Sequence, residues 1–516
     1  MINFEFHNPT KVIFGKNVEA EAGKEIKRLG GHKVLVHFGG DYLQANGTLD
    51  RIHKGLTDAG LEYVDLDGVV PNPRLSLVKK GIELCKKEGV DFILPIGGGS
   101  AIDSAKGIAY GLANDFELED LLMGKVKTDK IAPIGCISTI AATGSETSNS
   151  MVITIEEYEG QQNLKRSYNH DCARPLFACM NPELTYTLPV YQTASGASDI
   201  MMHTMERYFT NTKDVDLIDR IAEGLLVAVR EAAQVAIKTP DDYEARATLM
   251  WAGSLSHNGL TGTGRQSDFA SHKIEHELGG MFDVAHGAGL CAVWGSWARY
   301  VYKTNPARFA QFAVRIFDVP ENFYDVEATA LKGIEAWEDW CHKIGMPINL
   351  HELGIDPTDN QIKEMAENLA IRLRKGGKLA SNLSLYAGAA STSEYSSIKV
   401  SRNIEATQNT KELQDLAISL FREKYQGGAI RQIGISGNQL SDSSVKQLSL
   451  FESVQENQTN KKQELLQKAI DEIRETFDFL SIQKASSLSE DSRVIYRNKL
   501  IGGHAASQDK EVKDVS

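Results

Sequence analysis

Long apolar runs and paired cysteines are both missing from this chain. No stretch approaches the roughly 18 consecutive apolar residues that a membrane-spanning helix needs, and residues 1–10 carry Glu, Asn and His where a secretory leader would be apolar. The six Cys form no C-x-x-C pair. We therefore expect a cytoplasmic protein with reduced thiols, and a disulfide-stapled class is excluded.

A second absence divides the chain. All 13 Pro, 11 Met, six Cys and five Trp precede residue 380. At an average usage of about 5%, roughly seven Pro would be expected in the remainder alone. The change in composition predicts a boundary at about 375–382 between two pieces of different character.

What is present is ordinary for a globular protein. The 516 residues predict three or four domains, and the 42% hydrophobic and 24% charged residues exclude a disordered or collagen-like chain. The 56 Lys and Arg stand against 69 Asp and Glu, for a net charge of −13. This acidic balance gives no overall attraction to nucleic acid or an anionic membrane, although local patches could bind either.

The first part of the chain alternates between strand and helix patterns. Short β-like runs are separated by helical patterns, notably 76–88 and 101–113, and the runs occur at 33–38, 91–96 and 131–137. Such alternation predicts an α/β domain with a parallel sheet covered by helices. After about Tyr186 the strand signals stop, and long helical stretches predict a separate all-α domain: 214–238, 243–258 and 326–344.

A glycine-rich turn, Gly97-Gly98-Gly99-Ser100, lies between a predicted strand and a predicted helix. Glycines let a ligand approach the backbone, and successive N–H groups at a helix start attract anions, which suits a pyrophosphate. The same glycines also suit a tight turn that binds nothing. The turn is neither a Walker loop nor a G-x-G-x-x-G motif.

Several of the 13 His have a spacing that suits metal binding. Asp199 and His203 stand four residues apart, as do His272 and His276, so each pair shares one helical face, and His286 follows soon after. One carboxylate and three imidazoles suit a first-row divalent ion. Alternatively, such pairs are surface hydrogen bonds or satisfied core histidines.

Motifs in a fixed order carry a family resemblance: Asn8 to Gly15, Gly97 to Lys106, Ala142 to Thr147, Thr185 to Pro189, the Asp199/His203 pair and the His272/His276/His286 group. With these, residues 1 to about 379 resemble the iron-containing alcohol dehydrogenase family, close to its butanol dehydrogenase or aldehyde reductase branch. The resemblance implies an NAD(P)-dependent oxidoreductase acting on primary alcohols and aldehydes. It also implies a nucleotide-binding α/β domain, a helical metal-binding domain and a homodimer.

The same resemblance assigns the site. Metal ligation falls on Asp199, His203, His272 and His286, with Fe²⁺ expected and Zn²⁺ or Mn²⁺ also compatible. Cofactor contacts fall on Gly39, Asp41, Gly98, Gly99, Ser100, Asp103, Thr139, Thr143, Lys165 and Leu188. The acid at 41 favours NAD, since it would repel a 2′-phosphate, whereas relatives with small residues there use NADP. His276 is expected either to relay a proton or only to orient its neighbours.

The last part of the chain resembles something else. Ile404 to Thr410, Leu420 to Tyr425 and Gly427 to Ile435 are similar to the little finger of a bacterial Y-family DNA polymerase. The resemblance implies a sliding-clamp motif at Gln447, Leu448, Leu450 and Phe451. No palm with paired metal-binding carboxylates precedes this segment, so nucleotide addition is excluded. A DNA- or clamp-binding module is therefore the alternative function, and a gene fusion or a joining of two reading frames is open.

These considerations give four expected domains. They are a dinucleotide-binding α/β domain over 1–186, a helical metal-binding domain over 187–379, a partial little-finger-like α+β segment over 380–455, and a polar, partly helical or disordered tail over 456–516.

Overall fold

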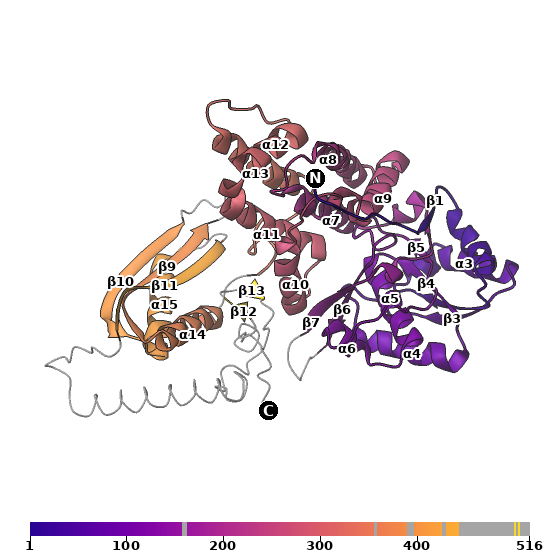
Figure 1. The fold of residues 1–516 in the computed structure, drawn as a ribbon, viewed down its shortest axis with the longest axis horizontal. Coiled ribbons are helices and arrows are strands. Elements are labelled where there is room, and N and C mark those ends of the chain that lie inside the picture. The colour runs from indigo at the N-terminus through magenta and orange to yellow at the C-terminus, as the bar shows by residue number, and fades with distance from the viewer. Residues whose placement is uncertain are drawn as a thin grey trace. The chain divides into compact units, whose positions relative to one another are not determined.

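The computed structural model describes residues 1–156, 163–355, 359–389, 397–425, 430–442, 500–501 and 504–505 (Figure 1). The chain forms two compact units, Met1–Leu353 and Gly354–Ser516. Among the described residues, no helix is both long and apolar enough to cross a lipid bilayer.

The first unit is built on a six-stranded parallel sheet. Its strand order is β1-β8-β5-β4-β2-β3, and the strands span Lys11–Phe14 (β1), Phe177–Met180 (β8), Cys136–Ser138 (β5), Phe92–Gly97 (β4), Lys33–His37 (β2) and Glu62–Leu66 (β3). All-parallel sheets are normally covered on both faces, which explains why β4 is buried along its whole length. The α/β fold predicted from the sequence is confirmed.

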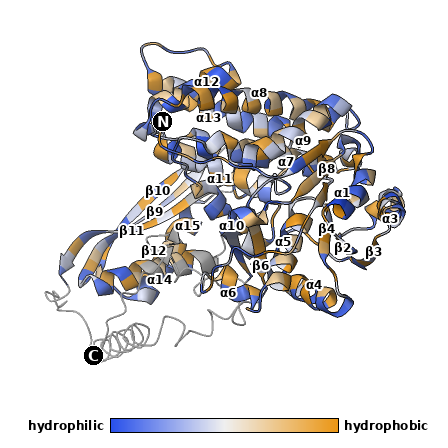
Figure 2. Ribbon diagram, turned by 45° about the vertical axis from the view of Figure 1, so that its right-hand side comes forward, coloured by the Kyte–Doolittle hydropathy of each residue, from blue (hydrophilic) through white to orange (hydrophobic). Residues whose placement is uncertain are grey.

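Alternate residues of the strands face two different hydrophobic layers. Val34 and Val36 of β2 pack with α1 (Ala22–Arg28) and α3 (Thr48–Asp58). Leu35, between them, packs on the other face. The helices there are α4 (Leu75–Glu88), α5 (Gly99–Ala113) and α6 (Leu118–Leu122). Figure 2 shows the hydrophobic colour along β4 inside the sheet and hydrophilic colour on the outer turns of α3.

The order of the strands predicts where a ligand would bind. The chain runs from β2 to β3 at one edge of the sheet and then returns to the other side of β2 as β4. In open parallel sheets, ligands bind beyond the carboxyl ends of the strands where the winding direction reverses. Here that position follows β2 and β4, the ends that carry the predicted glycines.

One predicted strand starts later than expected. The run 131–137 was expected to pair throughout, but β5 begins only at Cys136. Pro133 has no N–H to donate, and Ile134 makes only an isolated bridge to Ile93. A separate antiparallel hairpin, β6 (Ser150–Ile155) and β7 (Leu164–Asn169), packs between α5 and α10.

The second half of this unit is helical, as predicted. It comprises α7 (Val190–Tyr208), α8 (Asp216–Lys238), α9 (Tyr243–His257), α10 (Ala270–Phe282), α11 (His286–Val301), α12 (Pro306–Phe317) and α13 (Val326–Lys343). The core of this layer includes Trp294, Trp337 and Trp340. Helix α7 is buried from Thr193 to Tyr208, so it is the central helix and its polar residues face protein on every side.

Shorter elements connect these parts. They are the short helix α2 (Tyr42–Ala45) and single 3₁₀ turns at Val18–Glu21, Asp171–Ala173, Pro182–Thr185, Leu260–Gly262 and Tyr302–Thr304.

The second unit is a small α+β fold with its own core. An antiparallel sheet in the order β10-β9-β11 packs on two helices, and the elements are α14 (Asp359–Lys375), β9 (Lys378–Ala389), β10 (Ile398–Thr407), α15 (Thr410–Lys424) and β11 (Ile430–Asp442). Two-residue strands β12 (Leu500–Ile501) and β13 (His504–Ala505) pair with each other.

The division between the units differs from the one expected from composition. The predicted limit at 379 lies inside β9, whereas the compact units divide after Leu353. Helix α14 falls inside the range predicted for the helical domain, 187–379, but packs on β9 and α15. The predicted clamp residues 447–451 and most of the predicted tail, 456–516, lie outside the described residues.

Candidate metal centre and cofactor edge

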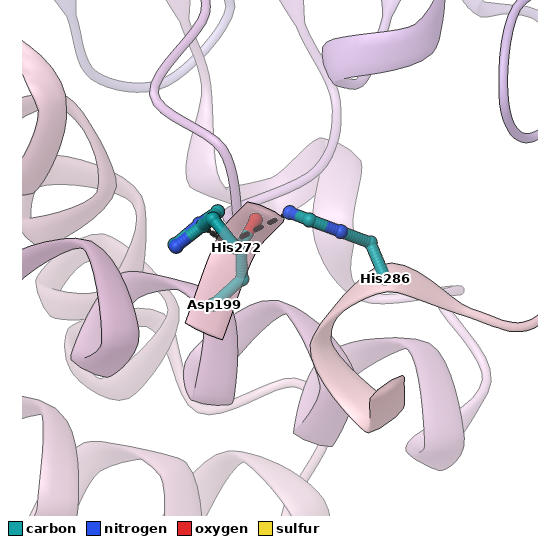
Figure 3. Close-up of side chains that lie close together, drawn as sticks. All are labelled: Asp199, His272 and His286. Atoms are coloured by element: carbon teal, nitrogen blue, oxygen red, sulfur yellow. Dashed lines mark ion pairs between the residues drawn. The ribbon is translucent and has the colours of Figure 1, made fainter. Parts of the chain in front are cut away.

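Three imidazoles converge on one carboxylate oxygen, Asp199 Oδ1. Its neighbours are the Nε2 atoms of His203 at 3.3 Å, His272 at 3.6 Å and His286 at 3.7 Å. Asp199 and His203 come from α7, His272 from α10 and His286 from the first residue of α11. Figure 3 shows His272 and His286 approaching Asp199 from two sides. The three histidines expected to bind metal therefore all approach the carboxylate of Asp199, the fourth predicted ligand.

The unsatisfied atoms at this point fit a cation. Asp199 is 2% exposed, yet among the described residues its Oδ1 has no hydrogen-bond partner, and neither has Nε2 of His272. Buried polar atoms without partners are costly unless something else satisfies them. Atoms that share a tetrahedral ion with bonds of about 2.1 Å lie about 3.4 Å apart, close to the observed spacing. Asp199, His272 and His286 also offer ligand atoms that all lie within 4.8 Å of one another.

Two further carboxylates stand behind the histidines. Glu206 of α7 contacts Nδ1 of His272 and also accepts from the His272 backbone N–H at 3.1 Å. Glu275 of α10 contacts Nδ1 of His286. Each contact turns the Nε2 atom of that ring toward Asp199. Burial lowers the pKa of His272, but Glu206 and Asp199 outweigh it and raise that pKa to about 9, so the place attracts positive charge.

His276 lies beside the centre rather than on Asp199. Its ring centroid is 5.7 Å from that of His286 and 6.3 Å from that of His272. Burial and the neighbouring Lys165 hold the pKa of His276 well below its ordinary value, so the ring is neutral. Together with Glu275 and His286 it offers a second set of ligand atoms within 4.8 Å.

Sequence reasoning missed three residues of this centre: Glu206, Glu275 and His257. The ring of His257, at the end of α9, lies 3.9 Å from that of His203, and Arg207 donates to its Nδ1 at 3.0 Å. Both Glu residues follow a predicted ligand histidine by three positions, which was a visible signal. His257 has no such signal, because its chain neighbours include no other candidate ligand.

The glycines predicted to contact the cofactor lie at the carboxyl ends of β2 and β4, called here the cofactor edge, and packing requires them. A Cβ on Gly39 would lie 2.1 Å from the Val69 carbonyl oxygen. One on Gly98 would lie 2.8 Å from the Ile140 side chain, and one on Gly99 would lie 2.4 Å from Thr143 Oγ1. The turn between β4 and α5 is therefore pressed against residues 140–143, and the first N–H groups of α5 begin there, where an anion is favoured.

The carboxylate of Asp103 already accepts hydrogen bonds from other residues of the chain. Its carboxylate accepts from Ser145 Oγ at 2.5 Å and from the Val152 N–H at 3.0 Å. Burial raises the pKa of Asp103, although the nearby Lys106 opposes this. Both carboxylate oxygens thus hold the segment that follows β5, whereas the resemblance placed Asp103 at the pyrophosphate. Half-buried Ser100 lies in the first turn of the same helix.

The remaining predicted cofactor contacts lie around the same edge. Thr139 follows β5, and its N–H donates to the Gly97 carbonyl at 3.0 Å, while its hydroxyl meets Tyr42 at 3.0 Å. Asp41 is exposed just before α2, and Leu188 is half-buried just before α7. Lys165 differs, since it lies on β7 with its Nζ 3.6 Å from Glu275 Oε2, beside the metal centre.

Several known proteins are similar to this chain in sequence and fold. Residues 9–182 match the family model for iron-containing alcohol dehydrogenase, and residues 193–376 match that for the C-terminal part of the Fe-containing alcohol dehydrogenase family. NADH-dependent butanol dehydrogenase A of Clostridium acetobutylicum is 38% identical over 371 residues, covering 71% of this chain and 94% of that protein. NADPH-dependent aldehyde reductase YqhD of Escherichia coli is 33% identical over 360 residues, covering 69% and 90%.

A solved structure agrees with these relatives. The crystal structure of NADH-dependent butanol dehydrogenase A from Thermotoga maritima has a TM-score of 0.67 at 38% identity, and covers 73% of this chain and 92% of that one. Separately, residues 351–450 match the C-terminal domain of the impB/mucB/samB family. This match confirms that the C-terminal part resembles the end of a Y-family polymerase.

Proposed function

Because the chain belongs to the iron-containing alcohol dehydrogenase family, we propose that its first unit transfers a hydride between NAD(H) or NADP(H) and a primary alcohol or short aldehyde. One observation carries the proposal: three imidazoles meet a buried, unpartnered carboxylate oxygen of Asp199. A centre of this kind would stand beside Lys165, a predicted cofactor contact, and His276.

The ligands in this proposal are Asp199, His203, His272 and His286, with Fe²⁺ as the ion because of the family. When bound, a divalent ion acts as a Lewis acid on the substrate oxygen and lowers the pKa of an alcohol. The chain's own residues hold the three imidazoles in one orientation. Zn²⁺ and Mn²⁺ remain alternatives, since the same donor types bind each of them.

The nicotinamide cofactor supplies the hydride acceptor or donor. We place its pyrophosphate at Gly98, Gly99 and the start of α5, where backbone N–H groups favour an anion. NADH is the proposed partner, because Asp41 follows β2 and would repel a 2′-phosphate. Several relatives are named as NADH-dependent, and the Escherichia coli reductase as NADPH-dependent.

His276 is the proposed proton carrier. Its ring is neutral and half-buried, and it lies next to His286 and close to Lys165. A neutral imidazole at this place can take the alcohol proton and pass it toward solvent.

The test combines metal analysis with a two-cofactor assay. The full chain, purified without added metal, is expected to carry close to one divalent ion and to oxidise NADH faster than NADPH with butanal, and a chelator should abolish the activity. Asp199→Asn should lose both metal and activity, while Asp216→Asn, an exposed carboxylate at the start of α8, should lose neither. Activity that survives complete removal of metal would refute the proposal.

A second function, binding of DNA or a sliding clamp, is supported only by the family match of residues 351–450. The clamp residues Gln447, Leu448, Leu450 and Phe451 lie outside the described residues. Capture of the chain by a bacterial sliding clamp, lost in Phe451→Ala, would support this function. The homodimer and the cytoplasmic location stay predictions, and light scattering tests the first.

A further inference from the structure

A buried carboxylate, Glu275, joins His286 of the candidate metal centre to Lys165, a predicted cofactor contact. It lies on α10 with a fully buried side chain. Its Oε2 contacts Nδ1 of His286 and lies 3.6 Å from the ammonium of Lys165 on β7. Among the described residues, no partner is present for its other oxygen, Oε1.

The helices around Glu275 leave room for this carboxylate. A Cβ on Gly279, one turn further along α10, would lie 3.0 Å from Oε1 and 3.2 Å from the Lys165 ammonium. A Cβ on Gly289 of α11 would lie 2.8 Å from the Glu275 Cγ. Two glycines on two helices thus open the space in which the carboxylate, the ammonium and the imidazole meet.

The contact has a direct consequence for His286. A carboxylate at Nδ1 accepts a hydrogen bond there, which fixes the proton on Nδ1 and leaves the lone pair on Nε2. That Nε2 is the atom 3.7 Å from Asp199 Oδ1. The ring is therefore presented in the tautomer and the direction that a metal ion requires.

Lys165 indicates which of two roles the Glu275 carboxylate has: ligand of a second metal ion, or support for His286. Glu275, His276 and His286 also form a set of possible ligands, but a second cation there would stand next to the ammonium of Lys165. The ammonium already offsets the buried negative charge. The set therefore serves as support for the first centre rather than as a second metal site.

We propose that Glu275 is a positioning residue: held by Lys165, its carboxylate orients His286 and thereby sets the affinity and the geometry of the metal centre. This inference rests on the proposed metal site and deepens it. It makes Lys165, a predicted cofactor contact, a second determinant of metal affinity.

The experiment measures Co²⁺ binding by the metal-free full chain, through competition with a chelator and through the visible spectrum of the bound ion. Losing such a supporting partner typically costs about 10–100-fold in affinity. Glu275→Gln, which still accepts a hydrogen bond, should weaken Co²⁺ binding about tenfold, and Glu275→Leu about 100-fold with a changed spectrum. Glu277→Gln is the matched control, because it lies on the same helix and faces Arg166 instead of an imidazole.

A further variant displaces the carboxylate without changing its charge. Gly289→Ala places a methyl group against Glu275 and should also weaken Co²⁺ binding, with the thermal midpoint as the check on folding. Should Glu275→Leu fail to fold, Glu275→Gln, which keeps the side-chain volume, decides. If the original chain binds Co²⁺ and both Glu275→Gln and Gly289→Ala bind it equally well with the same spectrum, the inference is overturned. If the original chain binds no Co²⁺, the proposed metal site itself fails.

Discussion

At the scale of the residue, the ligand types could be predicted but their partners could not. Both Glu206 and Glu275 stand three positions after a histidine, and this spacing alone would pair each acid with the histidine on its own helix. In the structure, Glu206 contacts His272 on another helix, and Glu275 contacts His286 on another. Neighbours along a helix share a face, but which ring a carboxylate reaches depends on how the helices pack.

His276 gives the first prediction at this scale. His276→Ala should retain its metal, because this ring does not approach Asp199, while turnover falls about 100-fold from loss of the proton carrier. Metal content by mass spectrometry and kcat with butanal measure the two effects. His257→Ala is a comparison, since it removes a buried ring near His203 instead. Loss of metal from His276→Ala would make this residue a ligand.

His37 gives a prediction about acid stability. Its Nδ1–H donates to the Leu66 carbonyl and its Nε2 accepts from Ser104, and burial lowers its pKa from 6.5 to about 4. Between about pH 6.5 and pH 4, the unfolded chain therefore binds a proton at His37 that the folded chain does not bind. The contribution of His37 to the free energy of unfolding is fully present above about pH 6.5 and is lost as the pH falls toward 4. Between pH 7 and pH 5 the free energy of unfolding should fall by about 2 kcal/mol because of this group.

The measurement uses the full chain, and follows the unfolding of its first unit by urea at several pH values. His37→Gln should be less stable at pH 7 but should lose less stability on acidification, because the titrating group is gone. An unchanged pH slope in His37→Gln would contradict the assignment.

At the scale of the element, β2 and β4 are covered by helices on both faces, so each is a short run of apolar residues that the sequence reveals. Residues of one parity face α1 and α3, and those of the other face α4 and α5. The hairpin of β6 and β7 could not be predicted in this way. It is held by a lysine of α5, Lys106, whose charge is fully buried.

Lys106 carries the prediction at this scale. Its ammonium donates to the carbonyls of Ser145, Ser148 and Ser150 at 2.8 to 3.0 Å and to the Ser145 hydroxyl at 2.9 Å. Lys106→Met would leave these acceptors buried without a donor, so the free energy of unfolding should fall by about 3 kcal/mol. Residues 140–143, which come just before this segment, press against Gly98 and Gly99 of the cofactor turn. The KM for the nucleotide should therefore rise more than kcat falls.

Chemical denaturation and steady-state kinetics measure these two effects. Lys80→Met, at an exposed position on α4, is the control and should change neither. A Lys106→Met protein with unchanged stability would mean that water replaces the ammonium at no cost.

At the scale of the whole molecule, composition predicts two pieces with a boundary at about 375–382, where the family match of the first piece ends, whereas the compact units divide after Leu353. The last Pro is Pro357 and the last Met is Met365, so the absence of these residues begins after the second unit has started. The two family models overlap at residues 351–376, the stretch that contains α14. Contacts with β9 and α15 place this helix in the second unit.

The division predicts the result of a truncation. A chain ending at Leu353 keeps the sheet, the helical core and every proposed ligand, so it should bind Co²⁺ and oxidise NADH with butanal as the full chain does. Circular dichroism and the assay test this. A chain ending at Lys343 is the contrast, because it removes Ile344, Met346 and Ile348, which are buried in the helical core. Loss of Co²⁺ binding on truncation at Leu353 would contradict the independence of the first unit.

The amino-acid sequence by itself determined the order of the α/β and helical layers and the family, because short-range periodicity and the order of short motifs are local features of the chain. It also predicted the candidate metal ligands by residue type. Only the tertiary structure decided that Glu206 and Glu275 support histidines on other helices, that Asp103 is engaged by Ser145 and Val152, and that α14 belongs to the second unit. These contacts join residues far apart in the chain, and the packing of helices and loops, which no local pattern records, brings them together.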